Sequence, residues 1–320
     1  MIGRRPLLAG AAAVAAASPV AAQTARPLVG FIAASSRQER FERAFVTGLR
    51  DQGLVLGRSI DVEFHWTAGT LEPMRAIVAD LLARRVAVIV TGGGNVTLLA
   101  RTLTDAVPIV FATAIDPIDD GLVVSLARPG GNVTGLSLQS VELAPKLIEV
   151  LRELVPKAMR VAVLHSTLSR TSAGRRAAIT AAARTIGIET REIGFANVEA
   201  MGRAFDEAAG MDGAIVLRDF LVEANMRAIV AHAARVKLPV IYEQAEPVRA
   251  GGLVSYAADF VEMHRRAAGY VARILRGVAP ADLPVEQPVR FELVLNLRTA
   301  RALGLSPPAV MLDYADEVIE

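Results

Sequence analysis

The stretch from Ala87 to Leu103 combines an apolar run, three consecutive glycines and a pattern typical of a helix. A glycine-rich turn between a strand and a helix can hold phosphate, because its backbone N–H groups point at the ligand. A phosphate loop also requires a lysine after its last glycine, and a dinucleotide site requires the spacing G-x-G-x-x-G. The turn Gly92–Asn95 meets neither requirement. It therefore predicts a ligand-binding surface at a helix N-terminus, with Asn95 as the helix cap or as a donor to a carboxylate.

The sequence contains no residue set with the spacing of a known catalytic or metal site. The four histidines fall on two predicted strand ends and two predicted helices, and no pair has metal-ligand spacing. The G-x-S-x-G, H-E-x-x-H and S-x-x-K patterns are missing. Asp119 and Asp120 are adjacent, so their side chains diverge and favour a turn over acid–base catalysis. We therefore expect no catalytic residue, no metal and no cofactor, and a protein that is not an enzyme.

Short polar segments follow most of the predicted strands. In open α/β sheets, ligands bind in the crevice outside the carboxyl ends of the strands. Acidic side chains there could neutralise an amino group, while Arg218, Ser35 and the helix N-terminus could take a carboxylate. Turn formation before a proline competes for Asp116, and an ion pair with Asp219 or Glu223 competes for Arg218. The candidate ligand-binding residues are Ser35, Ser36, Gly93, Gly94, Asn95, Thr113, Ala114, Asp116, His165, Ser166, Arg218, Asp219, Glu243 and Tyr256.

The elements that must position these residues alternate between strand and helix, which predicts parallel sheets with helices on both faces. Apolar runs predict a first series of strands at residues 28–34, 59–66, 86–91 and 108–113, with helices at 36–53, 71–85 and 95–103. A second series of strands is predicted at residues 159–166, 188–195, 213–219 and 239–245, with helices ending near residues 186, 209 and 236.

The two series match in order. Residues 107–117 and 238–247 both contain a strand led by proline and a turn with an acid before proline, and a Gly-Leu-Val step follows each. A repeat of about 130 residues predicts two similar α/β lobes, although general similarity between α/β segments is a competing explanation. The helix at 260–277 and the extended run at 285–297 have no counterpart in the first series, so they could connect the lobes.

The N-terminus resembles a secretory signal. It has a basic start, an alanine-rich apolar middle and small residues before Gln23, which predicts cleavage after Ala22. The apolar stretch is too short to span a bilayer, and a retained N-terminal helix is the competing interpretation. Arg4 and Arg5 leave the twin-arginine export route open, but Pro6 follows directly and weakens that motif.

Charge and cysteine content narrow the possible partners. The 320 residues carry a formal net charge of +2, and residues 1–22 hold two arginines and no acid, so the chain after cleavage is near neutral. Its basic residues form no block, which argues against nucleic acid as a partner. The absence of cysteine excludes disulfides and thiolate metal sites. We expect a secreted, monomeric protein with a small-molecule ligand.

Two long segments carry a family resemblance. "DPIDDGLVVSLARPGGNVTGLS" at 116–137 and the segment 251–305 resemble blocks of ABC-transporter substrate-binding proteins of the tryptophan/tyrosine-binding type, as does the ending "ADEVIE". The resemblance covers about residues 28–320. It implies a type I periplasmic binding protein fold, in which two Rossmann-like lobes with parallel sheets are joined by three crossovers. Characterised relatives of this type bind aromatic amino acids. The segments "HSTLSR" and "GGGN" depart from the family pattern within the expected cleft.

The resemblance also implies boundaries and a function. Lobe 1 would comprise residues 27–136 plus about 257–282, and lobe 2 would comprise 137–256 plus about 283–320, with hinges near 135–138, 254–257 and 281–286. The implied function is a periplasmic receptor that closes on an aromatic or apolar amino acid, or a similar molecule, and docks on ABC permease subunits at the membrane. Two alternatives stay open: a secreted sensing domain for a membrane signalling protein, and a doubly wound α/β enzyme.

Overall fold

A computed structural model describes residues 26–138, 141–169 and 172–320 of the chain. The predicted secretory signal at residues 1–22 lies outside the described residues. Within them, no helix combines the length and the apolar character that a membrane span requires.

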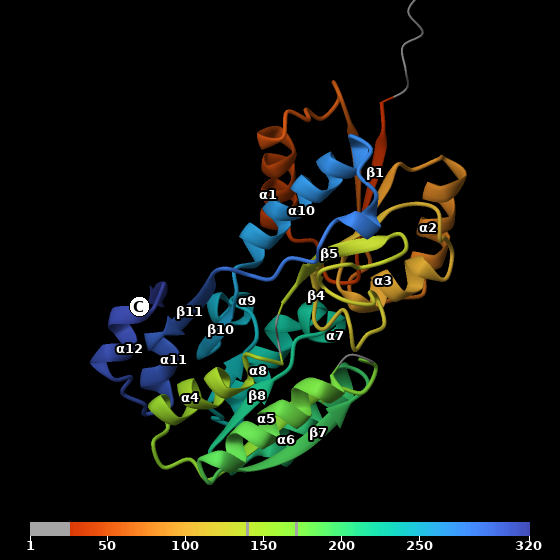
Figure 1. The fold of residues 1–320 in the computed structure, drawn as a ribbon. Coiled ribbons are helices and arrows are strands. Elements are labelled where there is room, and N and C mark those ends of the chain that lie inside the picture. Colours follow the sequence, from red (N-terminus) through yellow and green to blue (C-terminus); the bar gives the residue numbers. More distant parts are fainter. Residues whose placement is uncertain (1–25, 139–140, 170–171) are drawn as a thin grey trace, which may run out of the picture.

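Five parallel strands form the first sheet, in the spatial order β2-β1-β3-β4-β5 (Figure 1). They are β1 Leu28–Ala33, β2 Asp61–Trp66, β3 Val88–Gly92, β4 Ile109–Ala114 and β5 Val133–Ser137, and they alternate with helices α1 Glu39–Asp51, α2 Met74–Ala83 and α3 Gly94–Arg101. Every strand and helix predicted for this series is present. β5 was not predicted, because Gly135 interrupts its short apolar run. Gly135 has a φ of +148°, and a Cβ there would lie 2.0 Å from the carbonyl oxygen of Phe111, so the pairing of β4 with β5 requires glycine.

The second sheet has seven strands in the order β12-β11-β10-β9-β8-β6-β7. They are β6 Arg160–Ser166, β7 Glu189–Phe195, β8 Gly213–Val216, β9 Val240–Tyr242, β10 Val254–Ala258, β11 Phe291–Asn296 and β12 Glu317–Ile319. The helices are α4 Ala144–Leu154, α5 Ala173–Thr185, α6 Val198–Ala208, α7 Phe220–Ala224, α8 Met226–Arg235, α9 Glu246–Arg249, α11 Leu297–Ala302 and α12 Ala309–Tyr314. One pair, β10 with β11, is antiparallel. The helix expected to end near residue 236 is divided at Asn225 into α7 and α8.

The chain crosses between the two sheets near their junction. After β10 it enters α10 Phe260–Leu275, which packs on α1 and β4 of the first sheet, and after the short helix η1 Pro280–Asp282 it returns to β11 (Figure 1). The return segment lies beside the first crossing, because Ser137 N–H donates to the Glu286 carbonyl at 2.9 Å. We call the five-stranded sheet with its helices and α10 the first lobe, and the seven-stranded sheet with its helices the second lobe. The predicted two-lobed α/β fold is confirmed.

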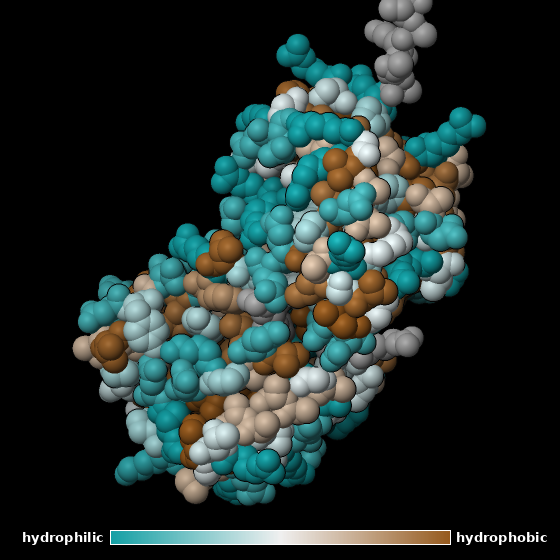
Figure 2. All heavy atoms as spheres, in the orientation of Figure 1, coloured by the Kyte–Doolittle hydropathy of each residue, from teal (hydrophilic) through white to brown (hydrophobic). Residues whose placement is uncertain are grey.

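Amphipathic helices explain why α10 joins the first lobe. Figure 2 shows hydrophilic side chains over the outward faces of α1 and α10. Their inward faces pack into one apolar cluster with β1, in which Phe45, Met263 and Tyr270 are buried. Removal of this apolar surface from water holds α10 on a sheet that is distant in sequence.

His264 is a polar exception inside this cluster. The residue is 3% exposed, its ring stacks on Phe41 with centroids 4.3 Å apart, and its Nδ1 lies 2.7 Å from the carbonyl oxygen of Phe260. Burial lowers the pKa of His264 to about 4, because the charged imidazolium cannot be solvated there.

We predict that His264 contributes to acid destabilisation. Its pKa is about 4 when folded and 6.5 when exposed, so the unfolded chain binds this proton first as the pH falls. The free energy of unfolding should be highest above pH 6.5 and should lose about 2 kcal/mol from this group between pH 7 and pH 5. Urea unfolding at both pH values measures the loss. His264→Phe should remove this part of the pH dependence, whereas His232→Phe, at a half-exposed site, should keep it. An unchanged pH dependence in the His264 variant contradicts the prediction.

Candidate ligand-binding site

A cavity lies between the two lobes, where the carboxyl ends of strands from both sheets meet. It encloses about 370 Å³ of space free of atoms, part of it open to solvent. The first lobe contributes Ala34, Gly92–Val96 and Ile115 to its wall, and the second lobe contributes Ser169, Arg218–Phe220 and Glu223. Five predicted residues therefore line one cavity: Gly93, Gly94, Asn95, Arg218 and Asp219.

The glycine turn forms the wall of the first lobe. Helix α3 begins at Gly94, and Gly93 is its N-cap with a φ of +123° and no side chain to accept from the helix. Asn95 lies inside the first turn, so the expectation that it caps α3 is wrong. A Cβ at Gly93 would meet nothing within 4 Å. The first-turn N–H groups of a helix have no intrahelical acceptor, so this wall offers neutral donors to a ligand.

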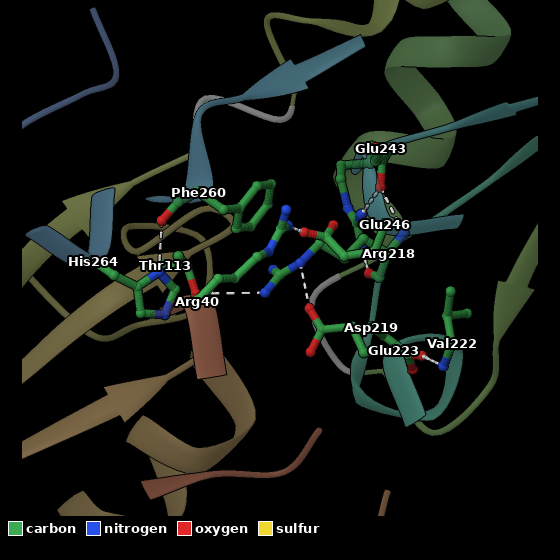
Figure 3. A network of polar contacts seen from close by, with 11 residues as sticks. Arg40, Thr113, Arg218, Asp219, Val222, Glu223, Glu243, Glu246, Phe260 and His264 are labelled. Atoms are coloured by element: carbon green, nitrogen blue, oxygen red, sulfur yellow. Dashed lines mark hydrogen bonds and ion pairs between the residues drawn. The ribbon is translucent and has the colours of Figure 1, made fainter. Parts of the chain in front are cut away.

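Arg218 joins the two lobes across the cavity (Figure 3). Its side chain is buried, and its Nε lies 2.5 Å from a carboxylate oxygen of Glu223. Its Nη2 reaches Thr113 Oγ1 in the first lobe at 3.5 Å, and its guanidinium lies 4.6 Å from the ring centroid of Phe260 at the start of α10. The ion pair with Glu223, which the sequence offered as an alternative to a ligand contact, is present. The contact with Phe260 has no sequence signal, because 42 positions separate the two residues.

The carboxylate of Glu243 is bound by groups of its own lobe and does not line this cavity. It pairs with Arg175, whose side chain is 1% exposed, and it accepts from the backbone N–H of Arg218 at 2.7 Å. Arg175 also donates to the Arg218 carbonyl at 3.1 Å. This buried pair positions the loop that carries Arg218. Sequence reasoning missed Arg175, since nothing distinguishes it from a solvated arginine on α5.

Asp219 and Glu223 are the acidic groups of the cavity wall. Asp219 Oδ1 accepts from Val222 N–H at 2.9 Å and so caps α7, and the Ser166 hydroxyl also interacts with this carboxylate, while Oδ2 forms no hydrogen bond of normal geometry with a described group. Burial raises the pKa of both carboxyl groups. For Glu223, the charge of Arg218 and a hydrogen bond from Ser35 oppose that rise.

The remaining predicted residues lie around this cavity without being among its lining residues. Ser36 contacts the carbonyl of Ala224 in the other lobe at 3.5 Å. Asp116 accepts from two N–H groups of its own turn, the role expected for an acid before proline. Ser166 accepts from Leu168 N–H at 3.2 Å. Thr113 and Ala114 are buried at the end of β4, His165 is half-buried at the end of β6, and Tyr256 lines a second cavity with Glu243.

Two α/β lobes with a cavity between the carboxyl ends of their strands have the type I periplasmic binding protein fold that the sequence resemblance implies. The chain belongs to the ABC transporter substrate binding protein family, whose model matches residues 28–319.

Individual relatives are distant in sequence. The tyrosine-binding protein of Clostridioides difficile is 25% identical over 269 residues, which cover 83% of this chain and 77% of that protein. An ABC domain from Streptococcus pneumoniae in complex with L-Trp superposes with a TM-score of 0.86 at 22% identity, covering 92% of this chain and 100% of the other. A ligand-free, open structure of a substrate-binding protein with adhesive properties from Clostridium difficile gives 0.69 at 24% identity, covering 92% and 99%. At these identities the structures establish a common fold.

We predict that Arg175 and Glu243 stabilise the second lobe as a pair. Arg175→Met leaves the Glu243 carboxylate buried without its partner and should lower the free energy of unfolding by about 3–5 kcal/mol. The double variant Arg175→Met with Glu243→Gln should recover part of this loss, because the neutral amide still accepts from Arg218 N–H. Urea unfolding of the single and double variants measures the coupling. Additive losses would show that the two side chains act independently.

Proposed function

We propose that this chain is the ligand receptor of an ABC importer and that its lobes close on a small polar molecule, an amino acid or a similar zwitterion. The observation that carries the proposal is the cavity between the lobes, whose wall combines an uncapped helix N-terminus from one lobe with buried charged groups from the other. Such a wall offers donors to a carboxylate and acceptors to an ammonium group. It binds both ends of a zwitterion only when the lobes are closed.

Contacts between the lobes support closure by hinge motion. Arg218 bridges to Thr113 and Phe260 on one side of the junction. On another side, Arg40 at the start of α1 forms an ion pair with Glu246 of α9, and burial lowers the pKa of Arg40 to about 10. The hinges we propose are the crossings near residues 135–138, 254–257 and 281–286. The corresponding lobes would be residues 27–136 with about 257–282, and residues 137–256 with about 283–320.

Relatives support the ligand class. One is named as a tyrosine-binding protein, and the Streptococcus pneumoniae domain holds L-Trp. The chain superposes better on that complex, with a TM-score of 0.86, than on the ligand-free, open structure at 0.69. This difference supports our proposal that the lobes are arranged as in a closed receptor. An aromatic or apolar amino acid is the ligand we propose.

Membership of the family supports our proposals for location, partners and mode of action. We propose that the protein acts in the periplasm after cleavage of residues 1–22, works as a monomer without converting its ligand, and delivers it to permease subunits. Membership of a family of substrate-binding proteins supports a role in binding a ligand over a role in catalysis.

A ligand screen tests the proposal. The chain from residue 23 onward, unfolded and refolded to remove any bound molecule, is titrated with the common amino acids in thermal-shift and calorimetric assays. At least one amino acid should raise the melting temperature and bind with micromolar or tighter affinity. A flat response to every amino acid would refute the ligand class, and turnover of any of them would refute a purely binding role.

We predict that Gly93 borders the bound ligand. Gly93→Leu places a side chain in the open space beside α3 and should weaken ligand binding at least about tenfold, as the loss of 1.4 kcal/mol or more would do. With a φ of +123° and a ψ of 156°, Gly93 has a conformation that is essentially restricted to glycine, so the substitution also costs about 1–3 kcal/mol of stability. Gly277→Leu is the matched control, because Gly277 has a φ of +96°, open space around its Cβ and a position beyond the end of α10. Calorimetry should give unchanged affinity for the control. Equal affinities for both variants would remove the glycine turn from the site.

A further inference from the structure

Asp219, Glu223 and Glu243 follow β8 and β9, and two buried guanidinium groups are paired with two of these three carboxylates. Arg218 is paired with Glu223, and Arg175 is paired with Glu243. Asp219 forms no ion pair with any described residue, although it lines the cavity and is only 6% exposed. Its Oδ1 caps α7, and the Ser166 hydroxyl also interacts with the carboxylate, but Oδ2 forms no hydrogen bond of normal geometry with a described group. Of these three carboxylates, Glu223 and Glu243 are paired with guanidinium groups, whereas Asp219, a residue that lines the cavity, is not.

A buried carboxylate without a partner is costly, and two events can relieve the cost. The group can take up a proton, in line with the raised pKa that burial gives Asp219. Alternatively, a cation can arrive at the unpartnered oxygen. Any ligand that brings an ammonium group into the cavity supplies that cation and restores charge balance.

Arg218 is the described cation on the cavity wall, and it is already engaged (Figure 3). Glu223 lies 2.5 Å from its Nε, Thr113 lies 3.5 Å from its Nη2, and the Phe260 ring covers its guanidinium. If Arg218 turned to a ligand carboxylate, Glu223 would stay buried without its partner, which typically costs several kcal/mol. Arg218 is therefore suited to holding the lobes together. A ligand carboxylate would instead meet the neutral N–H groups at the start of α3.

We infer that the receptor recognises its ligand through an ammonium group bound to Asp219 Oδ2, and that a ligand carboxylate is dispensable. This inference rests on the proposed receptor function and assigns the ligand class as primary amines, with amino acids as one subset. It replaces the sequence-based expectation that Arg218 takes the ligand carboxylate. The side chain of the ligand is not part of the inference.

Matched analogues separate the two ends of the ligand. L-tryptophan is compared by calorimetry with tryptamine, which lacks the carboxylate, and with indole-3-propionate, which lacks the amine; L-tyrosine, tyramine and 3-(4-hydroxyphenyl)propionate form a second set. The same comparison is made for any other amino acid that the screen identifies. Each amine should bind within about tenfold of its amino acid, and each deaminated acid should bind at least about 30-fold more weakly, as expected for loss of a buried charge pair.

The outcomes of this comparison distinguish the inference from the proposed function. A deaminated acid that binds as tightly as its amino acid overturns the inference, as does an amine that binds more weakly than the acid. Tight binding of a molecule without an amine, with no response to any ammonium compound, also overturns it but leaves the receptor function intact. No binding of any small molecule would count against both.

Asp219→Asn tests the counter-ion directly. Asparagine caps helices as well as aspartate, so the variant keeps its acceptor for Val222 N–H and loses only the charge. Its affinity for the amine and for the amino acid should fall at least about 30-fold. Asp212→Asn is the control, because Asp212 also accepts from backbone N–H groups but directly precedes β8, at the amino ends of β6 and β8 and away from the cavity. Its affinities should be unchanged. Wild-type affinity in a folded Asp219→Asn variant would overturn the inference, and the analogue series decides the question if that variant does not fold.

Discussion

The contact between the two lobes depends on compensating the charges that are buried at their junction. Arg218 is the centre of that compensation, because its guanidinium meets Glu223 in its own lobe and Thr113 and Phe260 in the other. A second buried arginine, Arg175, donates a hydrogen bond to the backbone carbonyl of Arg218 and so positions that residue. In a low-dielectric interior each of these contacts is stronger than in water, and each unpaired charge is more costly. The charge that the cavity wall offers to a ligand therefore depends on which side chains are left without an ion pair at the lobe junction.

The fold brings together segments that are distant in sequence to compensate the charge of Arg218. Helix α10 leaves the second sheet at β10 and packs against α1, so Phe260 reaches Arg218 from the first lobe. The return segment then pairs with the first crossing through Ser137 and Glu286. Neighbouring crossings of this kind allow each lobe to move as a unit, since bending is confined to a few residues. In the proposed mechanism, ligand binding and lobe closure are coupled because the loop after β8 both lines the cavity and contacts the first lobe.

Much of the fold was predictable because apolar periodicity reports burial directly. Every strand and helix of the first series was found, while β5 was missed because Gly135 breaks its pattern and is needed only where the chain approaches Phe111. The site was predictable in part. Gly93 and Asp219 follow strands at their carboxyl ends and do line the cavity. Glu243 follows a strand in the same way, but its carboxylate is taken by a buried arginine.

The sequence by itself determined the two α/β lobes, their order along the chain and the family, because these depend on local periodicity and on long matching segments. Tertiary structure alone decided which polar residues are available to a ligand. Asp219 and Glu243 are both acids that follow strands, and no local pattern separates them. Only the folded chain shows that Arg175 compensates Glu243 and that Asp219 forms no ion pair with a described residue. The physical reason is that charge compensation in a buried site depends on distances between segments far apart in sequence.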